Sequence, residues 1–403
     1  MKTTKKIVLA FSGGLDTSWC VPWLKETYEA EIITVFVDVG GAGEAELKAL
    51  ADKSKILGAD KHIHVDAREE YFSKVIRWLI AGHVMRGHLY PLCVGAERSL
   101  QAKIVAEMAL AEGATSVAHG CTAAGNDQVR FEIAFRTLTP QLEILAPIRD
   151  GGPSRADEVA FLEERNLPVP PDAKDYSINS GLWGVTIGGK ETCTTTDSIP
   201  ESAWQRTRGA FDQMKTPTHL SIGFFAGMPV SLNGRILDPV PLIETLDAQA
   251  ASFGIGRGIH LGDTILGVKG RVAFEAPAAT VLIAAHRELE KLTLTSTQQS
   301  VKDHLSTQYG ELVHTGRHLD PACRDMEALF EQSQRHVTGE VKVMLRTGMV
   351  FVEGAQSPFS LHDMAASIYG EEANDWTSND AKGFCALAAL PTKLAAQANG
   401  GTL

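Results

Sequence analysis

The chain has 403 residues and a formal net charge of −11, with 38 Lys and Arg against 49 Asp and Glu. Hydrophobic residues make up 44% and charged residues 22%, values that exclude a disordered chain. The acidic balance argues against a protein that binds nucleic acid through its phosphates. The length is enough for two or three domains.

The cysteine pattern and the apolar runs bear on location. Six cysteines are scattered along the chain without a C-x-x-C pair, so we expect free thiols and no protein-held metal site. The apolar run at residues 7–11 is too short for the core of a signal peptide. No stretch reaches the roughly 18 apolar residues of a membrane helix. We therefore expect a cytoplasmic protein with no membrane contact.

Short apolar strands alternate with helices over the first third of the chain. Strands are predicted at residues 7–10, 32–37, 63–65, 116–118 and 144–146, and helices at 16–28, 44–57 and 100–110. Strands that alternate with helices indicate βαβ units. The predicted fold class is α/β, with an open parallel sheet.

The pattern changes at the proline-rich residues 168–171, which we interpret as a linker. Beyond it we expect an α+β domain and an Ala/Leu-rich tail helix at 380–398, which packs within the chain or on another subunit. The predicted domains are residues 1–170, 171–375 and 376–403. The other predicted elements are strands at 220–225, 230–232 and 264–268, helices at 278–292 and 321–334, and a hairpin of 340–345 with 350–353.

The segment directly after the first predicted strand is the most informative. It reads Ala10-Phe11-Ser12-Gly13-Gly14-Leu15-Asp16-Thr17-Ser18. Its glycines let the backbone approach a phosphate, and the amides at the start of the next helix then face the anion. Hydroxyl groups at positions 12, 17 and 18 add donors, and Asp16 is a suitable ligand for the Mg²⁺ that accompanies a nucleotide.

The string S-G-G-x-D-[ST]-[ST] resembles the pyrophosphate loop of the ATP pyrophosphatases. Members of that superfamily cleave ATP between its α- and β-phosphates and adenylate their substrate. The string lacks the G-K-[ST] ending of a Walker loop, so kinases and GTPases fit poorly. The resemblance implies ATP, with Mg²⁺, as a ligand.

A second motif narrows the resemblance to one family. Residues 118–132 read A-H-G-C-T-A-A-G-N-D-Q-V-R-F-E and resemble the A-H-G-x-T-x-x-G-N-D-Q-V-R-F-E signature of argininosuccinate synthases. Shorter matches follow that family's order to the end of the chain, among them Tyr176-Ser177, Leu182-Trp183-Gly184, Gly256-Arg257 and Asp380-Ala381-Lys382-Gly383-Phe384. The resemblance therefore covers essentially all of the chain.

The resemblance implies a fold, a reaction and an assembly. The fold is an ATP-binding domain, a synthetase domain and a C-terminal helix used to build a homotetramer. The reaction joins citrulline and aspartate at the expense of ATP and releases AMP and pyrophosphate. In it the ureido oxygen attacks the α-phosphorus, and the aspartate amine then displaces AMP. The partners implied are small molecules only.

The resemblance also implies a set of site residues. Residues 10–18 hold ATP, together with Val37 and Gly120. Aspartate is bound by Thr122, Asn126 and Asp127. The residues expected to carry catalysis are Ser12, Asp16, Asn126, Asp127 and Arg130. The acceptor-binding residues are Tyr90, Gly95, Asn126, Arg130, Ser177, Thr186, Gly262 and Phe274.

The acceptor site departs from the family pattern. Gly95, Gly262 and Phe274 stand where the family has a serine, a glutamate and a tyrosine that recognise the amino-acid end of citrulline. Thr186 replaces a serine and keeps the hydroxyl, and Gly41 stands where the family usually has glutamine. The polar residues that could compensate are Asn179, Ser180, His260 and Asp263. We hypothesise a relative that keeps ATP and aspartate but activates a ureido, carbamoyl or carboxylate acceptor without an α-amino group.

Three other functions compete with this one. A tRNA thiolase is expected to show basic patches and paired cysteines, and an amidotransferase synthetase is expected to carry a glutaminase domain, none of which the sequence shows. A nucleotide-binding pseudoenzyme would not need the intact loop at residues 12–18 or the pair Asn126-Asp127. Citrulline itself stays open as the acceptor.

Overall fold

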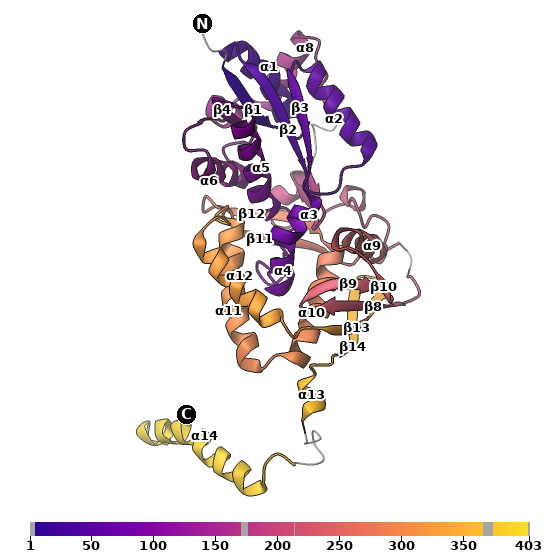
Figure 1. Cartoon of the computed structure of the whole chain (residues 1–403), viewed down its shortest axis with the longest axis vertical. Coiled ribbons are helices and arrows are strands. Elements are labelled where there is room, and N and C mark those ends of the chain that lie inside the picture. The colour runs from indigo at the N-terminus through magenta and orange to yellow at the C-terminus, as the bar shows by residue number, and fades with distance from the viewer. Residues whose placement is uncertain (1–4, 171–175, 213, 366–373, 402–403) are drawn as a thin grey trace. The chain divides into compact units, whose positions relative to one another are not determined.

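The computed structural model describes residues 5–170, 176–212, 214–365 and 374–401. The chain forms two compact units, one that ends at Ser357 and one that begins at Pro358. The larger unit contains one parallel and two antiparallel sheets with their helices (Figure 1). Of the predicted linker, Pro171 lies outside the described residues, and the domain limits at 170 and 375 remain a prediction.

The first sheet is parallel, as the alternation of strands and helices predicts. Its strand order is β3-β2-β1-β4-β5. Side chains of β1 are buried on both faces of the sheet, which explains its continuous apolar run. The strand order reverses between β1 and β4, and such a reversal opens a crevice at the carboxyl ends of these strands. The strands are β1 (Lys6–Ala10), β2 (Glu31–Asp38), β3 (Lys61–Asp66), β4 (Ser116–His119) and β5 (Glu143–Leu145).

Helices connect and cover these strands (Figure 1). The first of them continues through Pro22, so this proline does not end the helix. The helices of this part are α1 (Leu15–Tyr28), α2 (Glu44–Ile56), α3 (Arg68–Tyr71), the π-helical turn η1 (Phe72–Ile76), α4 (Arg77–Ala81), α5 (Glu97–Ala111), α6 (Asn126–Leu138), α7 (Pro147–Gly151) and α8 (Arg155–Glu164).

Two antiparallel sheets follow, which confirms the predicted α+β character of this part. One has the strand order β10-β9-β8-β13-β14 and the other β11-β12-β7-β6. The strands are β6 (Ser177–Gly181), β7 (Gly184–Gly188), β8 (Thr218–Phe225), β9 (Met228–Leu232), β10 (Arg235–Ile236), β11 (Arg257–Asp263), β12 (Lys269–Glu275), β13 (Gly339–Arg346) and β14 (Met349–Gln356). The helices are η2 (Lys190–Cys193), η3 (Glu201–Ala203), α9 (Pro239–Ala251), α10 (Pro277–Thr293), α11 (Ser296–His314) and α12 (Pro321–Gln334).

One predicted strand is wrong. Residues 264–268 form the turn between β11 and β12, closed by a hydrogen bond of 2.7 Å from the Thr264 amide to the Val268 carbonyl. Gly267 has φ of +85°, a conformation suited to a turn. Leu266 and Val268 are 54% and 62% exposed, so the apolar residues that suggested a strand lie at an exposed hairpin tip.

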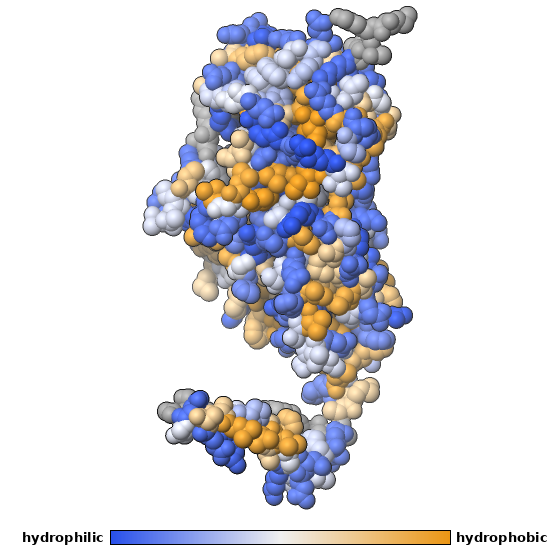
Figure 2. Space-filling model, turned by 90° about the vertical axis from the view of Figure 1, so that its left-hand side faces the viewer, coloured by the Kyte–Doolittle hydropathy of each residue, from blue (hydrophilic) through white to orange (hydrophobic). Residues whose placement is uncertain are grey.

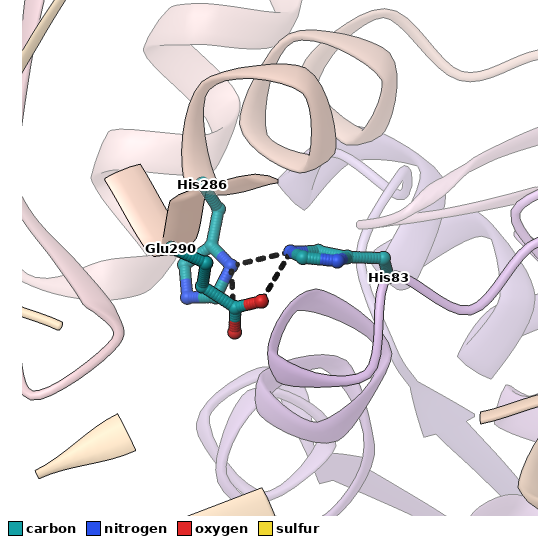
Figure 3. A group of neighbouring side chains, drawn as sticks. All are labelled: His83, His286 and Glu290. Carbon is teal, nitrogen blue, oxygen red and sulfur yellow. Dashed lines mark hydrogen bonds and ion pairs between the residues drawn. The ribbon is translucent and has the colours of Figure 1, made fainter. Parts of the chain in front are cut away.

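A buried cluster of charged and polar side chains links α10 and α11 to the segment after α4, and Figure 3 shows three of its members, His83, His286 and Glu290. His83, which follows α4, places Nε2 2.8 Å from Nδ1 of His286 and 3.6 Å from a carboxylate oxygen of Glu290, both on α10. Nζ of Lys302, on α11, lies 2.8 Å from that carboxylate. His83, His286 and Glu290 have ligand atoms close enough together for a metal ion. Because the Lys302 ammonium already supplies positive charge beside Glu290, we interpret the cluster as a structural ion-pair network.

The smaller unit contains α13 (Leu361–Met364) and the amphipathic helix α14 (Ser378–Ala398), which confirms the predicted tail helix. Figure 2 shows an apolar stripe along α14. Its exposed members are Phe384, Leu387, Leu390 and Leu394. Among the described residues, no helix is both long and apolar enough to cross a membrane.

Candidate functional site

The loop at residues 10–18 lies at the carboxyl end of β1 and leads into α1. Gly13 has φ of +74°, and a side chain there would collide with Leu50 of α2, so the position requires glycine. The Ser12 hydroxyl lies 3.2 Å from that of Thr17, and Ser18 donates to the Gly13 carbonyl over 3.4 Å. The loop therefore places hydroxyl and amide donors at the amino end of α1, where an anion is favoured.

A lysine that sequence reasoning missed closes one side of this loop. Lys53 of α2 donates to the Gly13 carbonyl over 2.8 Å. Burial lowers the pKa of its ammonium. The residue lies 40 positions from Gly13 and belongs to no motif, so only the packing of α2 against the loop reveals it.

The loop after β4 touches the loop after β1. A Cβ at Gly120 would lie 2.9 Å from Cγ2 of Thr17, so only glycine permits this approach. Asn126, at the start of α6, accepts a hydrogen bond of 2.8 Å from the Ile265 amide in the β11–β12 turn. The structure thus brings together two motifs that lie about a hundred residues apart, and it ties them to the third sheet.

Asp127 is held by two arginines. Arg98 of α5 donates to one carboxylate oxygen over 3.0 Å, and Arg130 of α6 donates to the other over 2.7 Å. Burial acts to raise the pKa of Asp127, but the two guanidinium groups outweigh it and hold the pKa below its usual value. Arg98 also donates to Asn179 of β6, over 2.6 Å. Asp127 is therefore a fixed anion at the centre of the site.

Four of the eight predicted acceptor residues, Ser177, Thr186, Gly262 and Phe274, share one face of the sheet β11-β12-β7-β6. Asn179, Thr186 and Phe274 are direct partners across β6, β7 and β12. Side chains two residues apart on a strand share a face, so Ser177, His260 and Gly262 belong to the same face. Ser177 is exposed on the outer strand, whereas Thr186 and Phe274 are buried.

Tyr90 covers two rings of this face. Tyr90 packs on Phe274 with ring centroids 5.1 Å apart and on His260 with centroids 5.7 Å apart. His260 covers Gly262, since a Cβ there would lie 2.6 Å from His260 Nε2. A Cβ at Gly95 would lie 3.0 Å from a guanidinium nitrogen of Arg130. Gly95 and Gly262, which depart from the family pattern, therefore make room for the side chains of Arg130 and His260.

Two further positions come from the sequence analysis. Val37 is buried at the carboxyl end of β2, and its carbonyl accepts from Gln101 over 3.4 Å. Gly41 has φ of +94°, and a Cβ there would lie 2.7 Å from the Ser180 hydroxyl. The glycine at 41 thus permits close contact with β6, a constraint invisible in the sequence.

Comparison with known proteins identifies the family. The Arginosuccinate synthase N-terminal HUP domain matches residues 6–168, and the Arginosuccinate synthase C-terminal domain matches residues 176–395. The argininosuccinate synthase of Symbiobacterium thermophilum is 39% identical over 391 residues, 97% of each chain. That of Bacillus thuringiensis is 38% identical over 396 residues, 98% of each chain. The chain belongs to the argininosuccinate synthase family.

This member of the argininosuccinate synthase family has a second carboxyl group beside its phosphate loop. Glu158 of α8 is buried beside Asp16. Burial, reinforced by the negative charge of Asp16, raises the pKa of Glu158 to about 8. Glu158 therefore carries a proton at neutral pH and lies next to the carboxylate predicted to serve Mg²⁺.

Glu158→Gln is expected to weaken the pH dependence of stability. A glutamate whose pKa rises on folding contributes stability below its unfolded pKa of about 4.5, and this contribution is lost as pH rises through about 8. Between pH 5 and 9 the free energy of unfolding of the wild type should fall by roughly 1–3 kcal/mol because of this group, whereas the glutamine variant should show no such fall. Urea denaturation at several pH values measures this. Glu163→Gln, an exposed change on the same helix, is the control, and equal pH slopes for E158Q and wild type would contradict the prediction.

Proposed function

We propose that this chain is an ATP-dependent, AMP-forming C–N ligase of the argininosuccinate synthase type. The acceptor is a ureido or carbamoyl compound, citrulline or an analogue. Its oxygen attacks the α-phosphorus of ATP and pyrophosphate leaves. The amine of aspartate then attacks the adenylated carbon, the bond from that carbon to the AMP oxygen breaks, and the amine loses a proton. One observation carries the proposal: the close contact of Gly120 with Thr17 joins the phosphate loop to the Asn126-Asp127 motif.

The roles of individual residues follow from their positions. Residues 10–18, with Val37 and Gly120, hold ATP. The Asp16 carboxylate is the kind of hard oxygen ligand that Mg²⁺ takes. Thr122, Asn126 and Asp127 bind aspartate. Since both oxygens of Asp127 already accept from arginines, its contact with the aspartate ammonium uses the remaining lone pairs. The residues that carry catalysis are Ser12, Asp16, Asn126, Asp127 and Arg130. The acceptor lies between Tyr90, Arg130 and the face of β7 and β12.

The cellular location, the oligomeric state and the metabolic role of the enzyme are part of the same proposal. All six cysteines are free, which suits the reducing cytoplasm. The exposed apolar stripe of α14 suits a helix that packs on another subunit in a homotetramer. With citrulline as the acceptor, the reaction belongs to amino-acid biosynthesis, at the step that introduces the third nitrogen of the arginine side chain from aspartate.

A product assay tests the proposal. Purified protein is incubated with ATP, Mg²⁺, ¹⁵N-aspartate and a ureido acceptor, and mass spectrometry follows the products. We expect AMP and pyrophosphate in equal amounts, together with a conjugate that contains ¹⁵N. ATP binding without pyrophosphate release, for every acceptor in a panel of ureido, carbamoyl and carboxylate compounds, would favour a nucleotide-binding pseudoenzyme instead.

A further inference from the structure

Four basic side chains converge on the acceptor face. Arg130 donates to the carbonyl of His314 over 2.9 Å and lies 3.2 Å from its Nδ1. Burial lowers the pKa of His314 to about 3, and Arg130, Arg86 and His260 each contribute to that lowering. His260, stacked on Tyr90, likewise has a pKa lowered by burial and then by Arg86. The positive charges of Arg86 and Arg130 thus surround two neutral imidazoles.

The contact between Arg130 and His314 defines which imidazole nitrogen carries the proton. A guanidinium only donates hydrogen bonds, so Nδ1 of His314 must accept. In a neutral imidazole the proton then resides on Nε2, which becomes a donor. This Nε2 is buried and has no hydrogen-bond partner among the described residues, and the same is true of Nε2 of His260. His314 itself is only 7% exposed.

A buried donor without a partner is costly, so it indicates a group that arrives with the ligand. Three carboxylates of this region are paired with cations. Asp127 accepts from Arg98 and Arg130, Glu311 pairs with Arg86, and Asp263 pairs with Lys269. A fourth carboxyl group, that of Glu97, lies 3.2 Å from Arg98 and has one buried oxygen without a partner, but burial raises its pKa to about 8, so it offers little negative charge to an ammonium at neutral pH.

We propose that His314 and His260, backed by Arg86 and Arg130, bind an anionic end of the acceptor. On the proposed ligase function, on which this inference rests, the preferred acceptor is a ureido compound that ends in a carboxylate and carries no ammonium. The Nε2–H of His314 donates to that carboxylate. An ammonium at the same place would face the Nε2–H donor of His314 beside the guanidinium groups of Arg86 and Arg130, which disfavours it.

The test compares three ureido compounds that differ only at the far end. 5-Ureidopentanoate carries the carboxylate, 4-ureidobutylamine carries the ammonium, and citrulline carries both. We expect kcat/KM for 5-ureidopentanoate to exceed that for citrulline by about 10-fold or more, and 4-ureidobutylamine to be the poorest. Citrulline turned over as well as 5-ureidopentanoate, or better, would overturn the inference.

Calorimetric binding of the same compounds to ATP-loaded protein separates this inference from the ligase function. If none of the three is ligated but 5-ureidopentanoate binds and 4-ureidobutylamine does not, the ligase function fails and the anionic pocket stands. If both bind equally, or neither binds, the anionic pocket is overturned whatever the protein catalyses.

Two variants probe the residues themselves. His314→Asn keeps an oxygen acceptor near the place of Nδ1, for Arg130, but removes the donor at Nε2. We expect it to lose about 10-fold in kcat/KM for 5-ureidopentanoate and less for 4-ureidobutylamine. His304→Asn, an exposed histidine on the same helix, is the matched control. An equal loss for both compounds would indicate a merely structural role and overturn the assignment of His314.

The second variant reverses the charge of the pocket. Because a Cβ at 262 meets His260, the change is made as the pair H260A/G262E. We expect the ratio of kcat/KM for citrulline over 5-ureidopentanoate to rise at least about 10-fold relative to the single variant H260A. Melting curves establish that each variant is folded. An unchanged ratio in folded H260A/G262E would overturn the proposal.

Discussion

Asp127→Asn is expected to lower kcat/KM for aspartate by about 10- to 10²-fold, because a hydrogen bond to a charged group contributes about 1.5–3 kcal/mol and about 1.4 kcal/mol is tenfold. In the structure the carboxylate accepts from Arg98 on one oxygen and from Arg130 on the other. An amide presents an NH₂ group to one of these guanidiniums and anchors only the other. Steady-state kinetics with ATP, aspartate and acceptor varied in turn measure the effect.

The substrates whose KM rises in Asp127→Asn distinguish two roles of Asp127. Direct contact with the aspartate ammonium predicts a higher KM for aspartate alone. A role in positioning Arg130 predicts a higher KM for the acceptor as well. ATP binding should be unchanged, since among the described residues no hydrogen bond or ion pair joins Asp127 to residues 10–18.

Asp303→Asn is the matched control for this variant. It makes the same change at an exposed carboxylate that pairs with Arg287 over 3.7 Å. Exposed ion pairs contribute little, so its kinetics should stay within about twofold of wild type. Wild-type kinetics for aspartate in Asp127→Asn would contradict the assignment of this residue.

The elements that bury continuous or periodic apolar runs could be predicted from the sequence. The helix at 321–334 begins and ends as predicted, and the five strands of the parallel sheet lie within one or two residues of their predicted ends. In these segments the buried positions follow the spacing of apolar residues in the sequence. The strand predicted at 264–268 is wrong because its apolar side chains are exposed at the tip of a hairpin. The pairing of β11 with β12 places them there, and that pairing is not visible in the local sequence.

The position of the loop at residues 10–18, between β1 and α1, could also be predicted, because its sequence pattern lies in consecutive residues; that the loop binds phosphate stays a prediction. The acceptor pocket could not be predicted to the same depth. His260 was named only as a residue that could compensate, and His314 was not named at all. His314 belongs to the site through a contact with Arg130, 184 positions away, and through the tautomer that this contact imposes. A long-range contact of this kind leaves no local pattern in the sequence.

Lys302 was missed for the same reason, and it carries the largest expected effect on stability. Its Nζ donates to the Ala81 carbonyl over 2.7 Å and lies 2.8 Å from Glu290, and both charged side chains are almost fully buried. Lys302→Met is expected to lower the free energy of unfolding by about 3–5 kcal/mol, because it leaves the Glu290 carboxylate buried without a counter-charge. Urea denaturation measures the loss. Lys291→Met, at an exposed lysine that pairs with Glu288 on α10, should cost less than about 1 kcal/mol.

A double variant and a pH series test whether the unpaired carboxylate of Glu290 causes the loss of stability in K302M. E290Q/K302M removes that charge and should recover most of the loss. Burial raises the pKa of Glu290 and Lys302 opposes this, so the single variant raises that pKa further. Stability from such a group is present below its unfolded pKa and is lost as pH rises through its folded pKa. The deficit of K302M should therefore grow from pH 5 to pH 8, whereas a pH-independent deficit would point to a packing defect around the substituted side chain rather than to the charge of Glu290.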